Sequence, residues 1–162
     1  MGIFAQLALR DSIEIKTTPE KIWEFFANLD KNYTTWHPQD HIVFKWVLGK
    51  PLEAGSKFYA EQLVMGKVRI YNGTISETIP KRKIAIEFDF PISIVSPKVE
   101  WLIEPKDSVC IFTAITYMRF GVLYQRLFKK HMKRLIEVHN KHTRAEAENL
   151  KKILEKGLVI KN

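Results

Sequence analysis

A series of β-rich runs between residues 42 and 120 is the feature that most constrains how this chain can fold. Each run is rich in β-branched and aromatic residues, and short segments containing Gly, Pro or Asp separate it from the next. Consecutive strands joined by short turns pair antiparallel, so the series predicts a continuous antiparallel sheet. The runs are residues 43–47, 57–64, 67–79, 83–90, 98–104 and 109–118.

Asn72-Gly73 lies inside the third run and is open to two interpretations. The pair is a strong signal for a two-residue hairpin turn, which would divide residues 67–79 into two strands. That division leaves two short pieces, so we favour one long strand that contains a β-bulge at Asn72-Gly73.

The segments before this series predict one further strand and two short helices. Residues 3–16 alternate loosely between apolar and polar positions, which is typical of a strand with one buried face. Thr18 and Pro19 then begin a helix over residues 19–28, because a Thr hydroxyl accepts from the first free amides and Pro already has a helical φ. A second short helix is expected over residues 29–36.

One long helix is expected after the sheet, because no strong turn signal occurs between Gly121 and Gly157. A helix over residues 122–156 with one inward stripe needs a sheet to pack against, so the order of elements predicts an α+β fold. We expect a curved antiparallel sheet of about six to seven strands wrapped around the long C-terminal helix, with the two short helices covering part of a cavity. The stripe consists of Phe128, Met132, Leu135, His139, His142, Glu146, Asn149 and Ile153.

Length and composition predict a globular protein with one domain. The chain has 162 residues, of which 46% are hydrophobic and 12% aromatic, and this excludes a disordered chain. We assign residues 1–157 to the domain and residues 158–162 to a C-terminal tail. The only cysteine, Cys110, is interpreted as a small core residue, and nothing requires an oxidising compartment. The N-terminus shows no targeting signal, so we expect a cytoplasmic protein.

The formal net charge of +8 is concentrated at the C-terminal end of the sequence. Residues 1–118 contain 14 basic and 14 acidic side chains, whereas residues 119–162 contain 12 basic and 4 acidic ones. A solvent-exposed outer face of the C-terminal helix explains this basic excess more simply than a groove that binds nucleic acid. We therefore expect no specific nucleic-acid partner. No apolar run approaches the roughly 18 residues of a membrane span, and we expect no membrane partner. An anionic partner on this helix is left open.

Two groups of histidines and carboxylates are candidates for chemistry. His37, Asp40 and His41 lie within five residues, in the loop that joins the short helices to the β-rich run at residues 43–47. His142 and Glu146 lie one helical turn apart on the inner stripe, where an unpartnered polar group would cost several kcal/mol. Zn²⁺ accepts His nitrogen and carboxylate oxygen, and a catalytic zinc site has three protein ligands plus water. These residues are therefore candidate ligands for zinc or another divalent metal, although they do not form a compact metal motif.

Glu61 is a further candidate ligand, because Glu is uncommon inside a strand unless it is functional or faces water. Each candidate also has a structural interpretation. His142 and Glu146 could form a buried hydrogen-bonded pair, His37 and His41 could be ordinary loop residues, and Glu61 could face solvent. Spacing alone does not decide between the two interpretations.

The sequence resembles the START-like, or SRPBCC, superfamily, whose members have the helix-grip fold. The resemblance covers nearly the whole chain and rests on the element order and on three segments. These are SIEIKTTPEKI at residues 12–22, LGKPLEAGSKF at residues 48–58 and YNGTISETIP at residues 71–80. Trp36-His37-Pro38, Glu61 and the pair His142 and Glu146 are similar to the diacetylphloroglucinol hydrolase branch of that superfamily.

That branch implies zinc held by histidines and glutamates, and cleavage of a carbon–carbon bond between an acyl group and an aromatic ring. In such a site Glu146 or Asp40 is expected to move a proton. The ligands that the resemblance implies are His37, Glu61, His142 and Glu146, with His41 as a nearby alternative.

The sequence therefore leads to two functional hypotheses. The first is a zinc-dependent hydrolase-like protein that acts on a small, partly apolar carbonyl compound such as an acyl-phenol. The alternative is a non-enzymatic carrier of a hydrophobic small molecule, because the same fold serves both purposes. In either case the expected partner is a small hydrophobic or aromatic ligand, and a homodimer is left open.

Overall fold

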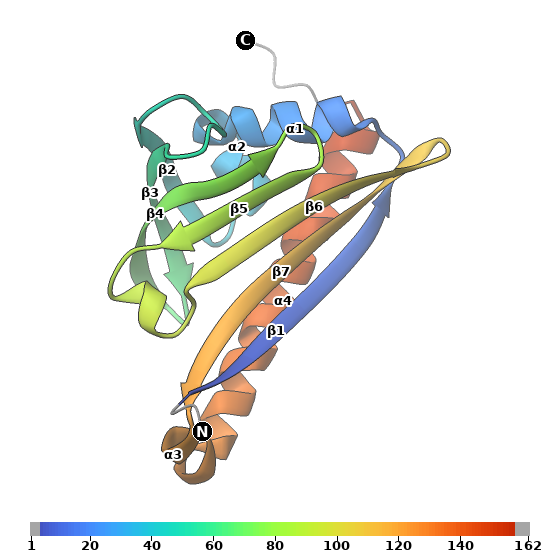
Figure 1. The fold of residues 1–162 in the computed structure, drawn as a ribbon. Helices are drawn as coiled ribbons and strands as arrows, with labels where there is room; N and C mark the ends of the chain where they lie inside the picture. The colour runs from blue at the N-terminus through green and yellow to red at the C-terminus, as the bar shows by residue number, and fades with distance from the viewer. Residues whose placement is uncertain (1–3, 158–162) are drawn as a thin grey trace.

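The computed structural model describes residues 4–157, in which seven antiparallel strands form one curved sheet (Figure 1). The strands pair in the order β1-β7-β6-β5-β4-β3-β2, so only the pairing of β1 with β7 joins strands distant in sequence. The arrangement confirms the predicted helix-grip α+β fold. The strands are β1 (Phe4–Ile15), β2 (His41–Leu48), β3 (Lys57–Val64), β4 (Lys67–Ile79), β5 (Lys83–Phe88), β6 (Lys98–Lys106) and β7 (Val109–Gly121).

The helices lie before β2 and after β7. The helices α1 (Pro19–Ala27) and α2 (Leu29–Trp36) connect β1 to β2, and a short 3-10 helix η1 (Ile92–Ile94) connects β5 to β6. After β7 come α3 (Val122–Leu127) and the long α4 (Lys129–Glu155), which runs along one side of the sheet (Figure 1).

Local sequence explains where α1 begins. The hydroxyl of Thr18 accepts a hydrogen bond from the amide of Lys21 at 3.4 Å, and Pro19 occupies the first helical position. Burial of Ile22, Phe25 and Phe26 then holds the helix on the sheet.

An aromatic cluster joins α1 and α2 to the sheet. The ring of Phe26 lies 5.3 Å from that of Trp36, 4.4 Å from Trp101 and 5.5 Å from Phe112, measured between centroids. Burying such rings supplies much of the stability of a core. Trp36 and Trp101 also line a cavity, so this cluster forms part of the cavity wall.

The expectation of one uninterrupted helix over residues 122–156 is wrong. Phe128 has φ −120° and ψ 34°, which is not helical, and it separates α3 from α4. Tyr124 stacks on Phe120 with a centroid distance of 6.2 Å and approaches Phe128 at 5.1 Å, and these contacts fix the break without Gly or Pro. Phe128 is 52% exposed and does not belong to the inward stripe of α4.

The strand over residues 67–79 is single, as predicted, but the predicted bulge at Asn72-Gly73 is wrong. Both residues pair with β3 in unbroken register, and the register with β5 shifts instead between Ile75 and Glu77. Gly73 has a packing role, because a Cβ atom there would lie 2.7 Å from the ring of Phe58. The Asn-Gly pair therefore indicates a close approach and not a turn.

Other expectations concern the core and the ends of the chain. Cys110 is buried, as predicted, and its Sγ donates to the carbonyl oxygen of Thr17 at 3.3 Å. Among the described residues, no helix is both long and apolar enough to cross a bilayer. The predicted tail, residues 158–162, lies outside the described residues, and the assignment of residues 1–157 to one domain stays a prediction.

Candidate metal centre and ligand cavity

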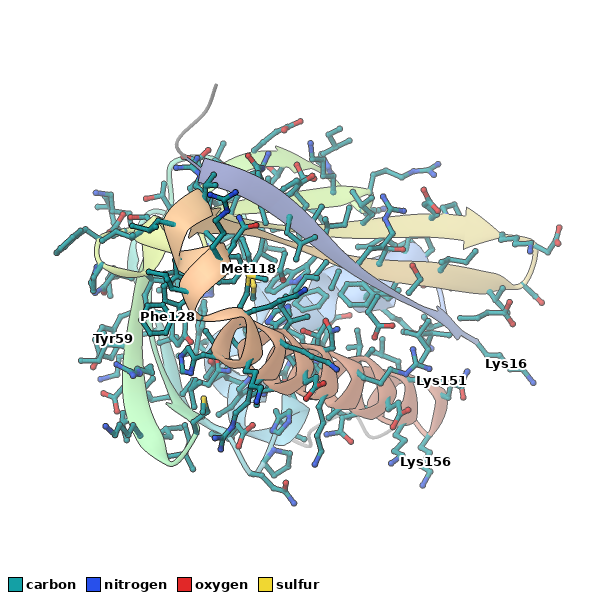
Figure 2. All side chains as sticks on the ribbon, turned by 90° about the horizontal axis from the view of Figure 1, so that it is seen from below. Lys16, Tyr59, Met118, Phe128, Lys151 and Lys156 are labelled. Atoms are coloured by element: carbon teal, nitrogen blue, oxygen red, sulfur yellow. The ribbon has the colours of Figure 1, made fainter. Side chains whose placement is uncertain are left out.

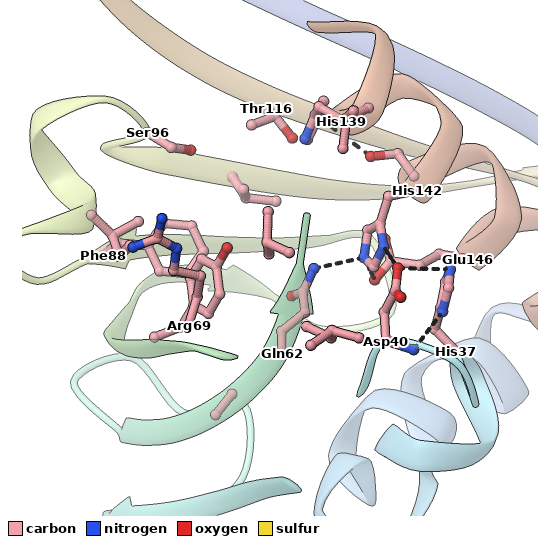
Figure 3. Close-up of a pocket in the computed structure, with 18 of the residues that line it drawn as sticks. His37, Asp40, Gln62, Arg69, Phe88, Ser96, Thr116, His139, His142 and Glu146 are labelled. Atoms are coloured by element: carbon pink, nitrogen blue, oxygen red, sulfur yellow. Dashed lines mark hydrogen bonds and ion pairs between the residues drawn. The ribbon is translucent and has the colours of Figure 1, made fainter. Parts of the chain in front are cut away.

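A cavity of about 990 Å³ lies between the sheet, α2 and α4. Apolar and aromatic side chains form most of its wall, and a cluster of His, Asp, Gln and Glu side chains lies at one end (Figure 3). Two of the five tyrosines, Tyr33 and Tyr71, line this cavity and could offer a hydroxyl group to a ligand. The polar end is formed by His37, Asp40, Gln62, His142 and Glu146, with His41 buried behind them.

Two hydrogen bonds hold the end of α2 against α4 and so bring the two sequence groups together. Trp36 Nε1 donates to the carbonyl oxygen of Glu146 at 3.0 Å, and Asn149 Nδ2 donates to the carbonyl oxygen of Trp36 at 3.1 Å. The chain then turns, because the amide of His41 donates to the carbonyl oxygen of His37 at 2.9 Å. The segment 37–41 is thereby fixed beside the inner face of α4.

His41 is the most deeply buried member of the cluster, with a side chain that is 1% exposed. It is the first residue of β2 and not a loop residue. Its Nδ1 lies 2.9 Å from the carbonyl oxygen of Tyr33, so Nδ1 carries the hydrogen and donates it. Its Nε2 lies 3.0 Å from Glu146 Oε1, yet within residues 4–157 it makes no hydrogen bond. A buried nitrogen of this kind requires a partner.

His142 connects both carboxylates of the cluster. Its Nδ1 lies 2.9 Å from Asp40 Oδ2, and its Nε2 lies 3.3 Å from Glu146 Oε1. Burial lowers the pKa of His142, but hydrogen bonds and charges from Glu146 and Asp40 outweigh burial and raise the pKa to about 9. For Glu146, burial raises the pKa, but His142 and His41 outweigh it and lower the pKa to about 2. Without a metal, His142 and Glu146 therefore form an ion pair.

Gln62 makes a conflicting demand on the same nitrogen. Its Nε2 lies 2.9 Å from His142 Nε2. An amide N–H can donate to this nitrogen only when the nitrogen carries a lone pair and no hydrogen. The contact with Glu146 favours a protonated Nε2. A protonated Nε2 satisfies both contacts only when the amide of Gln62 turns its Oε1 towards His142.

The atoms His41 Nε2, His142 Nε2 and Glu146 Oε1 lie within 4.8 Å of one another. Both histidines donate from Nδ1 to an oxygen, which is the arrangement that orients metal-ligating imidazoles. Two nitrogens and one carboxylate oxygen match a zinc site that keeps a position open. The residues present therefore fit a divalent metal.

A second group overlaps the first. His37, Asp40 and His142 also bring one ligand atom each within 4.8 Å. The ring of His37 stacks on that of His142, with centroids 4.4 Å apart, and its Nδ1 accepts the amide N–H of Asp40 at 3.2 Å. Burial and the neighbouring His142 lower the pKa of His37, so this ring is neutral. This group would require Nδ1 of His142, which already donates to Asp40.

Most residues of the predicted site come together, but Glu61 does not. His37, His41, His142 and Glu146 meet at the polar end of the cavity, together with the predicted proton carrier Asp40. Because side chains alternate along β3, Gln62 points into the cavity and Glu61 points to the opposite face of the sheet. There Glu61 accepts a hydrogen bond from the hydroxyl of Tyr59. The prediction of Glu61 as a metal ligand is corrected accordingly.

Sequence reasoning missed Gln62 and the backbone carbonyl of Tyr33 as members of the site. The phase of β3 contains a signal for Gln62, because Phe58 and Ala60 are buried and Gln62 continues the same face. No side-chain pattern indicates the carbonyl of Tyr33, which acts through the backbone.

No protein-family model and no curated protein matches this sequence. Solved structures match it along nearly its whole length. The di-domain ARO/CYC StfQ from the steffimycin biosynthetic pathway has a TM-score of 0.76 and 12% identity, with 96% of this chain and 52% of StfQ covered. A START superfamily protein from Mycobacterium smegmatis has a TM-score of 0.70 and 10% identity, covering 92% of this chain and 97% of that protein.

A norcoclaurine synthase point mutant from Thalictrum, in complex with a transition-state analogue, has a TM-score of 0.73 and 11% identity, with 98% and 99% of the two chains covered. The chain spans about half the length of the di-domain proteins StfQ and BexL. At such identities these similarities show the fold alone. The chain has the helix-grip fold of START-like proteins.

Proposed function

We propose that this protein binds a small, partly apolar carbonyl compound beside a zinc ion, or another divalent metal, and hydrolyses it. The observation that carries the proposal is the convergence of His41 Nε2, His142 Nε2 and Glu146 Oε1 at the polar end of the cavity. Within residues 4–157, His41 Nε2 lies 3.0 Å from Glu146 Oε1 without making a hydrogen bond, and a divalent metal would accept its lone pair and bind the same carboxylate. A metal would also bind the Nε2 lone pair of a neutral His142 and the carboxylate of Glu146 at once, so that Glu146 would no longer need a proton on this nitrogen.

The bound metal would polarise a carbonyl oxygen and lower the pKa of a bound water towards about 7. His41, His142 and Glu146 would hold it, and Asp40 would orient His142 by accepting its Nδ1–H. Because Glu146 is then a ligand, Asp40 is the carboxylate that is free to take a proton. The side chain of Asp40 is 31% exposed and lines the cavity, so its carboxylate can reach a water molecule beside the bound carbonyl compound.

The cavity suggests a substrate with an aromatic body. Its wall is mainly apolar and aromatic, and the hydroxyl of Tyr33 lies 3.5 Å from Gln62 Oε1. Burial raises the pKa of Tyr33, so its hydroxyl stays a neutral donor for a phenolic or carbonyl oxygen. An acyl-phenol fits this chemistry. Hydrolysis would add water across the bond between ring and acyl carbon and release a carboxylic acid and the deacylated phenol.

Metal content tests the first part of the proposal. We expect the purified protein to contain one zinc per chain, measured by elemental analysis after dialysis. His41→Ala, His142→Ala and Glu146→Gln should each lose most of it. Glu61→Gln is the matched control, because it removes a carboxylate on the opposite face of β3 and should keep the metal. Equal loss in Glu61→Gln, or a metal-free wild type that does not take up zinc, would overturn the metal site.

Turnover tests the second part. The zinc-loaded protein should convert a diacylphloroglucinol to a monoacyl product and a free acid. Chromatography measures the loss of the substrate and the formation of both products. Asp40→Asn should retain the metal and lose most of this activity, because it lacks the free carboxylate. Bound zinc without turnover of any acyl-phenol would reject the hydrolase and leave the metal site intact.

A carrier of a hydrophobic small molecule is the second candidate. A cavity of about 990 Å³ with an apolar wall favours it, because this volume suits retention of a drug-sized ligand. Native mass spectrometry of the protein as purified distinguishes the two functions. An intact apolar compound retained in the cavity of a metal-free protein would support the carrier.

A further inference from the structure

The segment from the end of β7 into the first turns of α4, residues 119–136, is both apolar and basic; we call it the α3 patch. Leu123 is 69% exposed, Leu127 is 67% exposed and Phe128 is more than half exposed. Large apolar side chains that lie together on the surface usually mark an interaction site. The candidate metal centre does not account for them.

The α3 patch contains no acidic residue, and the first one that follows is Glu137. All its basic side chains are exposed, and among the described residues only Lys133 forms an ion pair, with Glu137 at 4.0 Å. The patch therefore presents a strong positive charge beside its apolar side chains. The basic residues are Arg119, Arg126, Lys129, Lys130, Lys133 and Arg134.

The connection between β5 and β6 extends the apolar surface. Phe90 in this connection is 78% exposed, and Ile94 and Val95 are also exposed. The amide of Arg119 donates to the carbonyl oxygen of Val95 at 2.7 Å, so the connection is tied to the α3 patch. In Figure 1 the connection lies at the lower left of the sheet, and α3 lies below it, beyond the end of β7. Figure 2 shows Phe128 at one end of α4, with Lys151 and Lys156 at the other.

The ligand cavity has part of its wall in the same region. Met65, Pro91, Val95 and Arg134 line it, and they come from the β3–β4 turn, the β5–β6 connection and α4. A surface that covered the α3 patch would therefore lie close to this side of the cavity.

We propose that the α3 patch docks on the surface of an anionic lipid bilayer. A short amphipathic helix with exposed leucines and flanking lysines binds at the headgroup boundary through apolar burial and attraction to anionic lipids. A second copy of this chain would bring two strongly basic patches together, and their charges would repel. Nucleic acid would leave the aliphatic Leu123 and Leu127 without a partner, because bases stack on aromatic rings.

The expectation of no membrane partner rested on the lack of a spanning segment, whereas this proposal concerns binding at the surface of a bilayer. It concerns a helix that lies on the bilayer and does not cross it. It is independent of the proposed function, since it needs neither the metal nor the cavity ligand.

Vesicle flotation tests the proposal with the full chain. The wild type should float with vesicles of phosphatidylserine and phosphatidylcholine and stay behind with phosphatidylcholine alone. Each basic residue at an anionic surface contributes about fivefold, so Lys129→Glu with Lys130→Glu should weaken binding more than about 25-fold. Leu123→Ser with Leu127→Ser should weaken it by at least about tenfold while all charges stay. Both pairs are exposed, and unchanged thermal unfolding would confirm that the variants fold.

The matched control is Lys152→Glu with Lys156→Glu, which makes the same charge change in the last turn and at the C-cap of α4, where Figure 2 labels Lys156. This variant should bind within about twofold of the wild type. Its substitutions lie at the far end of a 27-residue helix, farther from the α3 patch than the Debye length of about 10 Å. No flotation of the wild type, or equal loss in both charge variants, would overturn the proposal. So would a dimer in light scattering that the leucine substitutions convert to a monomer, or tighter binding to DNA than to the vesicles.

Discussion

The Nε2 atom of His41 lies 3.0 Å from the Oε1 atom of Glu146, and this contact joins the first residue of β2 to α4. The Nδ1 atom of His41 donates to the carbonyl oxygen of Tyr33, so in the neutral ring Nε2 presents a lone pair to a carboxylate. Two acceptors at this distance repel unless a proton or a metal cation lies between them. The chemistry of the cluster therefore depends on which cation occupies this position.

Zinc affinity should rise with pH between 7 and 9. In the metal-free protein the pKa of His142 is raised to about 9, so the imidazole carries a proton at pH 7 that zinc must displace. We expect about one proton released per zinc at pH 7 and an affinity that rises about tenfold per pH unit until about pH 9. Calorimetry in two buffers of different ionisation enthalpy measures the number of protons released per zinc, and competition with a chelator measures the zinc affinity.

Glu61→Gln serves as the control for this titration and should show the same slope. An affinity that does not change from pH 7 to pH 9 would contradict the assignment of His142 as a ligand, because a ligand with so high a pKa must lose a proton.

Asp40→Asn should lower zinc affinity about 10–100-fold without abolishing the site. Asp40 does not belong to the ligand group of His41, His142 and Glu146; it holds the imidazole of His142 by accepting from Nδ1. Asparagine keeps an acceptor oxygen but loses the charge. Chelator competition measures the change, and one zinc per chain should still bind at saturation. Complete loss of zinc would mean that Asp40 is itself a ligand.

The order of elements could be predicted because each element has a local cause. Thr18 and Pro19 define the start of α1, and alternating β-rich runs with turn residues between them define the strands. The break at Phe128 could not be predicted, because stacking of Tyr124 on its aromatic neighbours produces it and no Gly or Pro is present. These stacking contacts join residues only four positions apart, but no residue type in the segment marks the break in the sequence.

The site could be predicted at the level of its segments and not of each residue. Residues 37–41 and the pair on α4 stand out by residue type, and their meeting follows from the fold. The choice between Glu61 and Gln62 depends on the phase of β3, and a shift of one residue reverses which side chain points inward. The burial of His41 depends on its position at the start of β2, since a position in the preceding loop would leave it exposed.

In the metal-free state, the free energy of unfolding should differ between the wild type and Glu146→Gln by an amount that depends on pH. The pKa of His142 is raised from 6.5 to about 9, so its contribution is fully present below pH 6.5 and is lost as the pH rises through about 9. The pKa of Glu146 is lowered from 4.5 to about 2, so its contribution is present above pH 4.5 and is lost as the pH falls through about 2. Both contributions are therefore complete between pH 4.5 and 6.5.

Within that window Glu146→Gln should lower the free energy of unfolding by about 3 kcal/mol, because it breaks a buried ion pair. The difference should shrink as the pH approaches 9. Urea unfolding in the presence of a chelator at pH 6 and pH 9 measures both values. An equal difference at the two pH values would show that the substitution acts through packing and not through the charge of His142.

Gly73→Ala should destabilise the fold by about 1–3 kcal/mol, because the added methyl group overpacks the sheet. Its Cβ atom would lie 2.7 Å from the ring of Phe58 and 2.8 Å from the carbonyl oxygen of Glu87, and a backbone oxygen inside the sheet cannot move aside. Gly121→Ala is the matched control, because the nearest atom there is the Cβ of Tyr124 at 4.0 Å. Urea unfolding of both variants measures the difference, and a Gly73→Ala protein as stable as Gly121→Ala would mean that β4 has room at this position. Because Phe58 also lines the cavity, its displacement in Gly73→Ala should weaken binding of an apolar ligand, whereas Gly121→Ala should leave binding unchanged.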